Sequence, residues 1–93
     1  MPTVLKLYQP AELCQAVKRG ESLNSRVIVV FRIQPVAEGD SYEYRPGYPV
    51  ERVKATIRMQ FDVKPTGRIE KVSGIVTGIS DGVVQMEQCH ATE

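Results

Sequence analysis

Residues 50–64 read VERVKATIRMQFDVK, and this stretch is the strongest indication of the class of fold. From Val53 to Lys64, apolar and polar residues alternate without a break. The apolar positions are Val53, Ala55, Ile57, Met59, Phe61 and Val63. Successive side chains of a β-strand point to opposite faces of its sheet, so this period of two predicts a long strand over 50–64 with one face in a core. The Pro65-Thr66-Gly67 segment that follows has the residues of a turn.

The rest of the chain is also rich in β-branched residues, since Val and Ile together number 19 against four Leu. Such side chains favour strands over helices. The pattern predicts three further strands over residues 26–34, 68–79 and 83–87, with a polar tail over 88–93. The strand at 26–34 is apolar on both faces, which is typical of a strand that lies centrally or is covered on its second face.

Two glycines and one turn refine this prediction. Gly74 and Gly78 interrupt the alternation of the strand at 68–79, which indicates a bulge or a sharp bend. Asp81-Gly82 between the last two strands is among the strongest signals of a tight hairpin. Residues 35–49 contain several Pro and Gly and read as a long irregular loop, part of which extends the flanking strands in an alternative interpretation.

One amphipathic helix is expected over residues 10–19. Pro10 suits the first helical position, and Glu12 lies in the first turn. Leu13, Ala16 and Val17 share one face at helical spacing, and a glycine follows the last turn. Residues 3–8 before the helix fit either a short strand or an irregular lead-in.

The order of elements predicts one α+β domain over residues 1–93. In it, an N-terminal amphipathic helix packs on a strongly bent antiparallel sheet of four to five strands. A small SH3-like or Sm-like barrel would satisfy this order, and a half-open sheet wrapped on the helix would satisfy it equally well. The resemblance to Sm-type RNA-binding proteins ends at the order of elements, so it assigns no residues.

Composition limits the partners and the compartment. The chain has 93 residues with 12 Lys and Arg against 11 Asp and Glu, a net charge of +1 that produces no overall basic field. No apolar run reaches the roughly 18 residues of a membrane span, and the first residues lack the pattern of a secretory signal. Cys14 and Cys89 form no CxxC motif, which suits a reducing compartment. We therefore expect a cytoplasmic protein without membrane contact.

The side chains offer little for catalysis. The one histidine, His90, lies in the predicted polar tail, where Cys89 and Glu87 cannot complete a fixed metal site with it. The serines lack a histidine base on an ordered element, and no phosphate-binding glycine loop is present. We therefore expect no enzyme, no metal and no cofactor.

Three of the four tyrosines, Tyr42, Tyr44 and Tyr48, fall within seven residues and are interleaved with Arg45. Tyrosine and arginine are enriched at interaction hot spots because they bring large contact areas. This segment therefore suggests a surface that recognises a protein. In the alternative interpretation, Tyr42 and Tyr44 share one face of a strand and cover the end of the core.

The polar face of the strand at 50–64 carries Arg52, Lys54 and Arg58. This face would either follow a phosphate backbone, with the tyrosines stacking on bases, or only keep the strand edge from aggregating. A second apolar face at Ile28 and Val30 suits a symmetric partner. The hypothesis is a small non-catalytic binding or adaptor module that acts through protein contacts and self-associates. The alternative is a small barrel that binds RNA or single-stranded DNA. The candidate binding residues are Tyr42, Tyr44, Arg45, Tyr48, Arg52, Lys54 and Arg58.

Overall fold

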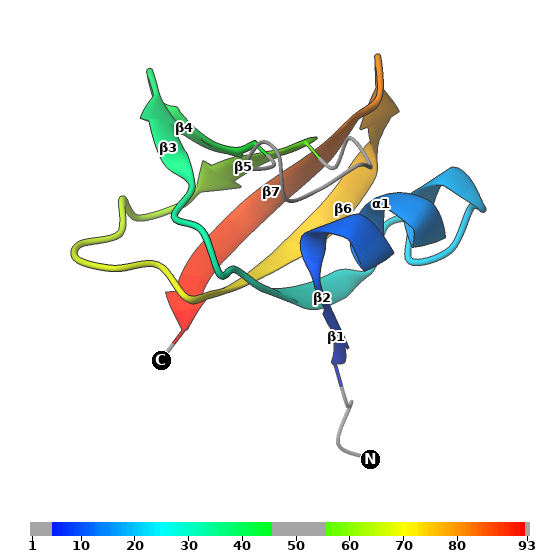
Figure 1. Ribbon diagram of the computed structural model, residues 1–93, viewed down its shortest axis with the longest axis horizontal. Helices are drawn as coiled ribbons and strands as arrows, with labels where there is room; N and C mark the ends of the chain where they lie inside the picture. The colour runs from blue at the N-terminus through cyan, green and yellow to red at the C-terminus, as the bar shows by residue number, and fades with distance from the viewer. Residues whose placement is uncertain (1–4, 46–55, 93) are drawn as a thin grey trace.

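A computed structural model describes residues 5–45 and 56–92. The elements of this part are β1 (Lys6–Tyr8), α1 (Pro10–Lys18), β2 (Arg26–Val30), β3 (Val36–Glu38), β4 (Ser41–Tyr44), β5 (Thr56–Phe61), β6 (Lys71–Ser80) and β7 (Val83–Thr92). Its strands form one seven-stranded sheet in the order β1-β2-β6-β7-β5-β4-β3 (Figure 1). Strands β1 and β3 are the edges, so the sheet is open.

The sheet is mixed because two pairs of strands run parallel. Strand β1 pairs parallel with β2, and α1 is the connection between them. Strand β7 folds back from β6 through a hairpin and enters beside β5, to which it is parallel. Asp81 and Gly82 turn this hairpin with φ of 52° and 78°, the left-handed conformation that a tight turn of this kind requires.

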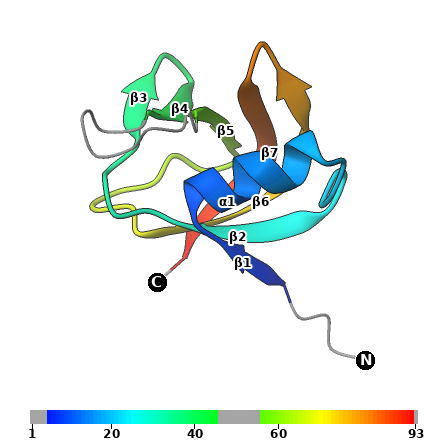
Figure 2. The ribbon, with the colours of Figure 1, turned by 45° about the vertical axis from the view of Figure 1, so that its right-hand side comes forward.

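The helix confirms the prediction made from its spacing and ends one residue earlier than expected. Its start is stabilised by Glu12, whose carboxylate accepts a hydrogen bond of 3.1 Å from the backbone N–H of Gln9. The buried side chains of α1 are Pro10, Leu13, Cys14, Ala16 and Val17. They lie inside the curve of the sheet, and α1 contacts β1, β2, β5, β6 and β7 (Figure 2).

The core lies between α1 and the inner face of the sheet, which we define as the face toward the helix. Strands contribute alternate residues to it, as their period predicts. The buried apolar side chains from the strands are Val27, Val29, Tyr44, Ile57, Met59, Val72, Val76, Val84, Met86 and Cys89. We call the opposite face the outer face.

The predicted architecture was wrong in its sheet. An antiparallel sheet of four to five strands, with an SH3-like or Sm-like barrel as one form, is replaced by an open mixed sheet of seven described strands. Two of the additional strands, β3 and β4, form a hairpin inside the segment expected to be a loop at 35–49. The parallel pairs arise between strands that are distant in sequence, which local alternation does not encode.

The predicted polar tail at 88–93 was also wrong, because β7 continues to Thr92. Gln88 has a φ of 52° and lies at a shift of register between β6 and β7. The extra residue of such a bulge reverses the alternation. Cys89 is therefore buried in the core although it follows an exposed pair, Glu87 and Gln88.

The strand predicted at 50–64 is confirmed only in its middle. Ile57 and Met59 are fully buried, but β5 ends at Phe61, and Val63 is 75% exposed instead of lying in the core. Residues 50–55 lie outside the described residues. The strand predicted at 26–34 ends at Val30, after which Phe31 is buried and Ile33 is exposed.

The bend predicted at the glycines of β6 is confirmed by shifts of register on either side of Ile75 and Val76. At Gly74 the two central strands approach each other closely. A Cβ on Gly74 would lie 2.6 Å from Sγ of Cys89 and 2.9 Å from Cε of Met86. At Gly78 a Cβ would meet no atom within 4 Å.

We predict that Gly74→Ala lowers the free energy of unfolding by about 1–3 kcal/mol, since the added methyl overpacks the core. Thermal or denaturant unfolding measures this loss. The matched control is Gly78→Ala, which should be neutral or stabilising because its methyl has open space and alanine loses less backbone entropy. Adding Cys89→Ala to the Gly74→Ala protein should recover part of the loss. Equal losses at both glycines would contradict the steric explanation.

Candidate functional site

The sequence-predicted binding residues divide between the two faces of the sheet. Of the seven, the described residues contain Tyr42 and Tyr44 on β4, Arg45 directly after it, and Arg58 on β5. Tyr48, Arg52 and Lys54 lie outside the described residues. Tyr42 and Tyr44 pair with Met59 and Ile57, whose buried side chains belong to the inner face, whereas Arg58 pairs with Glu43 on the outer face.

Tyr44 is a core residue. It is 2% exposed, and its ring centroid lies 5.1 Å from that of Phe31 at an interplanar angle of 39°. Tyr42 is half-buried and packs edge-on against Phe61, with centroids 5.2 Å apart at 72°. Both arrangements are favourable for aromatic rings. Sequence analysis left two interpretations of these tyrosines, a recognition surface and a cover over the end of the core. The burial of Tyr44 agrees with the second.

The two described arginines among the predicted binding residues, Arg45 from the tyrosine segment and Arg58 from the basic face, are neutralised by carboxylates. Glu43 accepts a hydrogen bond of 2.8 Å from Nε of Arg45 and one of 3.4 Å from Nη2 of Arg58. Arg45 also donates through Nη2 to Glu38, at 3.2 Å. Two cations and two anions therefore balance within this cluster. Sequence analysis did not identify Glu38 and Glu43 as the ion-pair partners of these arginines. One signal was available: Glu43 and Arg45 are two residues apart, which places both on one face of a strand.

The arginines also change the acidity of Glu43. The hydrogen bond from Arg45 is the largest cause that lowers the pKa of this carboxyl below its ordinary value of 4.5, and Arg58 adds to it. The side chain of Glu43 is only 10% exposed, and burial of a carboxylate raises its pKa. The two arginines outweigh this effect, so the net change of the pKa is downward. The charged form of Glu43 is therefore held between two cations on the outer face.

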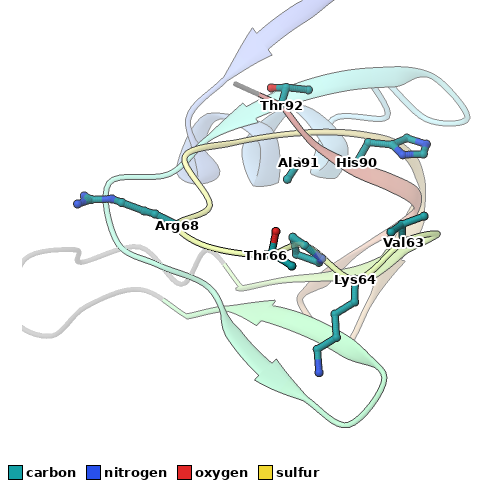
Figure 3. Close-up of a pocket in the computed structure, with 8 residues that line it drawn as sticks. Val63, Lys64, Thr66, Arg68, His90, Ala91 and Thr92 are labelled. Carbon is teal, nitrogen blue, oxygen red and sulfur yellow. The ribbon is translucent and has the colours of Figure 1, made fainter.

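A second group of polar side chains surrounds a hollow at one end of the sheet. The hollow has a volume of about 390 Å³ and is lined by Val63, Lys64, Pro65, Thr66, Arg68, His90, Ala91 and Thr92 (Figure 3). The segment after β5 forms one wall, and the end of β7 forms the other. His90, expected in a tail, lies on β7 with Nε2 3.3 Å from Oδ2 of Asp62.

A smaller hollow of about 150 Å³ adjoins this site, because Lys64 lines both. Its other lining residues are Gly39, Asp40, Tyr42 and Phe61. Of this set, sequence analysis proposed only Tyr42 as a binding residue, and it placed Phe61 on the apolar face of a strand. The local pattern predicts that residues 62–64 end a strand, that residues 65–67 form a turn and that the last strand stops at residue 87, so it does not bring the two walls together.

Four apolar side chains lie together on the outer face, and we call them the outer apolar patch: Leu7, Ile28, Val30 and Ile75. Leu7 pairs with Ile28 across β1 and β2 and is 61% exposed. Ile28, Val30 and Ile75 are half-buried. In the described part of the chain, no helix or strand packs on this face, since α1 occupies the inner one.

The cysteines are structural in this fold. The side chains of Cys14 and Cys89 are both buried. Burial raises the pKa of Cys89 to about 12, so this thiol stays protonated at neutral pH and is a poor nucleophile.

Among residues 5–45 and 56–92, no three His, Cys, Asp or Glu side chains gather as metal ligands do. No helix there is long and apolar enough to cross a membrane.

We predict that Tyr44→Ala lowers the free energy of unfolding by about 3–5 kcal/mol, the usual cost of removing a buried aromatic ring. Val63→Ala shortens an apolar side chain that is 75% exposed, and it should change the free energy of unfolding by less than about 0.5 kcal/mol. Denaturant unfolding of both variants measures the difference. Near-equal stabilities would show that the ring of Tyr44 is not part of the core.

The lowered pKa of Glu43 predicts a dependence of stability on pH. The charged carboxylate stabilises the fold fully above about pH 4.5, its ordinary pKa, and this contribution is lost as the pH falls through the lower pKa of the folded state. Glu43→Gln should therefore destabilise the protein at neutral pH and less so in acid. Unfolding measured from neutral to acid pH tests this, with Glu70→Gln, in an exposed pair with Arg68, as the charge-matched control. A difference from wild type that stays constant with pH would contradict the prediction.

Comparison with known proteins gives no match to any protein-family model, any curated protein or any solved structure. What the chain does must therefore be argued from its own contacts, charges and exposed surfaces.

Proposed function

We propose that this protein is a small non-catalytic binding module that self-associates through the outer apolar patch. The observation that carries the proposal is the exposure of Leu7, at 61%, beside Ile28 on a face that no described helix or strand covers. Removing such a patch from water by contact with another molecule is favourable. A chain with two buried thiols is compatible with the reducing cytoplasm, which the proposal takes as its compartment.

The register of the sheet places polar side chains around the apolar ones. Arg26, Ile75 and Glu87 form a row across β2, β6 and β7. Ile28 and Ser73 form the neighbouring row, which Leu7 extends at one end and His90 at the other. An apolar centre with a polar rim is the usual anatomy of a protein interface.

The charges of the rim favour a second copy of the chain as the partner. Arg26 and Glu87 lie on either side of Ile75 and carry opposite charges. Consider two copies related by a twofold axis that runs parallel to β6 and passes over Ile75. Arg26 of each copy would then lie opposite Glu87 of the other, so the ion pair would form twice. Closed dimers of this kind are the commonest protein assemblies, and each contact in them is made twice. The interface of the pair would then be apolar at its centre and compensated in charge at its rim.

We predict that Leu7→Glu converts the assembled protein to a monomer, because the carboxylate cannot be buried in an apolar interface without a partner. Light scattering after size-exclusion chromatography measures the mass of each form. Val63→Glu is the matched control: it places the same charge at an apolar residue that is 75% exposed and outside the patch, and it should leave the mass unchanged.

The rim is tested separately by charge exchange. Glu87→Arg should weaken the assembly, and Arg26→Glu added to it should restore the assembly, since the opposite charges again face each other. A wild-type protein that is monomeric at high concentration would refute self-association. An assembly that Leu7→Glu leaves intact would refute the outer apolar patch as its interface.

A further inference from the structure

The two hollows at the end of the sheet share Lys64 as a lining residue, and we call them together the Lys64 groove. Its larger part lies between the segment after β5 and the end of β7, and its smaller part lies over Tyr42 and Phe61. None of these residues belongs to the outer apolar patch.

The larger part of the groove is basic. Lys64, Arg68 and His90 line it together with the hydroxyls of Thr66 and Thr92. No carboxylate belongs to the lining of this larger part, whereas Asp62 contacts His90 at 3.3 Å and Asp40 lines the smaller part. Lys64 makes no ion pair with any described residue. Arg68 has only an exposed contact of 3.5 Å with Glu70, in which both side chains are more than two-thirds accessible. Exposed pairs of this kind contribute little, so the guanidinium remains available to a ligand.

The directions of these side chains decide what kind of anion fits. In Figure 3 the side chains of Lys64, Arg68 and His90 point away from one another around the groove instead of toward a common centre. Side chains arranged in this way do not converge on a single phosphate ion. A chain of phosphates can contact one basic side chain at each of several points along its length, as single-stranded nucleic acid does in open basic grooves.

The smaller part of the groove supplies an aromatic surface. Tyr42 and Phe61 are both half-buried, in edge-to-face contact with centroids 5.2 Å apart, and both line the hollow next to Lys64. Nucleic-acid bases stack on aromatic side chains without regard to sequence, and basic residues beside the rings hold the phosphates. An acidic peptide would use the cations but would gain nothing comparable from the rings.

We propose that the Lys64 groove binds single-stranded nucleic acid, with phosphates at Lys64 and Arg68 and a base against Phe61. This surface differs from the one expected from sequence, in which Arg58 is engaged with Glu43 and both Arg52 and Lys54 lie outside the described residues. Lys64, in contrast, makes no ion pair with any described residue. The inference goes beyond the proposed self-association, since Lys64, Arg68 and Phe61 belong neither to the outer apolar patch nor to its rim, and it can fail or succeed independently of it.

The test uses the full chain and a fluorescein-labelled oligothymidine of about 12 nucleotides, whose binding is followed by fluorescence anisotropy. Affinity should fall steeply between about 50 and 200 mM salt, and Lys64→Gln should reduce the slope of log K against log salt by about 0.7, the value for one lost phosphate contact on a single strand. Phe61→Leu keeps an apolar side chain but removes the ring, and it should weaken binding by about fivefold or more.

The matched control is Lys18→Gln, which removes the same charge from the exposed last turn of α1, away from the groove. It should leave both affinity and slope unchanged, because the contact at Lys64 is local. Absence of binding at about 50 mM salt would overturn the proposal. So would an equal effect of Lys18→Gln and Lys64→Gln, which would indicate attraction by net charge alone. Equally strong competition by polyglutamate would assign the groove to acidic protein segments instead.

Discussion

The contact between β6 and β7 is the constraint on which the rest of this fold depends. These two strands occupy neighbouring central positions in the sheet, and every other strand attaches to them directly or through one or two intervening strands. Their register shifts twice, once on each side of the Ile75 and Val76 pair. Bulges of this kind increase the bend and twist of a sheet. The bend lets strands on both sides of the hairpin reach α1, so a helix of nine residues is enough to cover the core.

The same contact explains why β7 has a buried side chain, Cys89, directly before an exposed one, His90. Cys89 enters the core against the bare backbone of Gly74, and its neighbour His90 points to the other side, beside Asp62. The wall of the Lys64 groove is therefore fixed by a core contact made by the residue just before it. Loops alone would hold these side chains less firmly than a strand in the middle of a sheet does.

The elements with a strong local pattern could be predicted from the sequence, and those created by long-range pairing could not. The helix, the alternation at Ile57 and Met59, and the bend at Gly74 each depend on residues close in the chain. The partners of β1 and β7 depend instead on which distant strands come together, and a parallel neighbour leaves no local trace. The tyrosine segment shows the same limit for function: clustering in sequence could not say that Tyr44 lies in the core while Arg45, its neighbour, lies in an ion-pair cluster with Glu43.

The two edge strands have a consequence for the behaviour of the protein at high concentration. Strands β1 and β3 span only three residues each, and each carries an exposed charge, Lys6 on one and Glu38 on the other. An exposed edge can template the addition of further strands and so start a fibril, but a short, charged edge offers too few backbone hydrogen bonds to do this. The open sheet thus blocks amyloid-like growth from both described edges, although it leaves the broad outer face available for association.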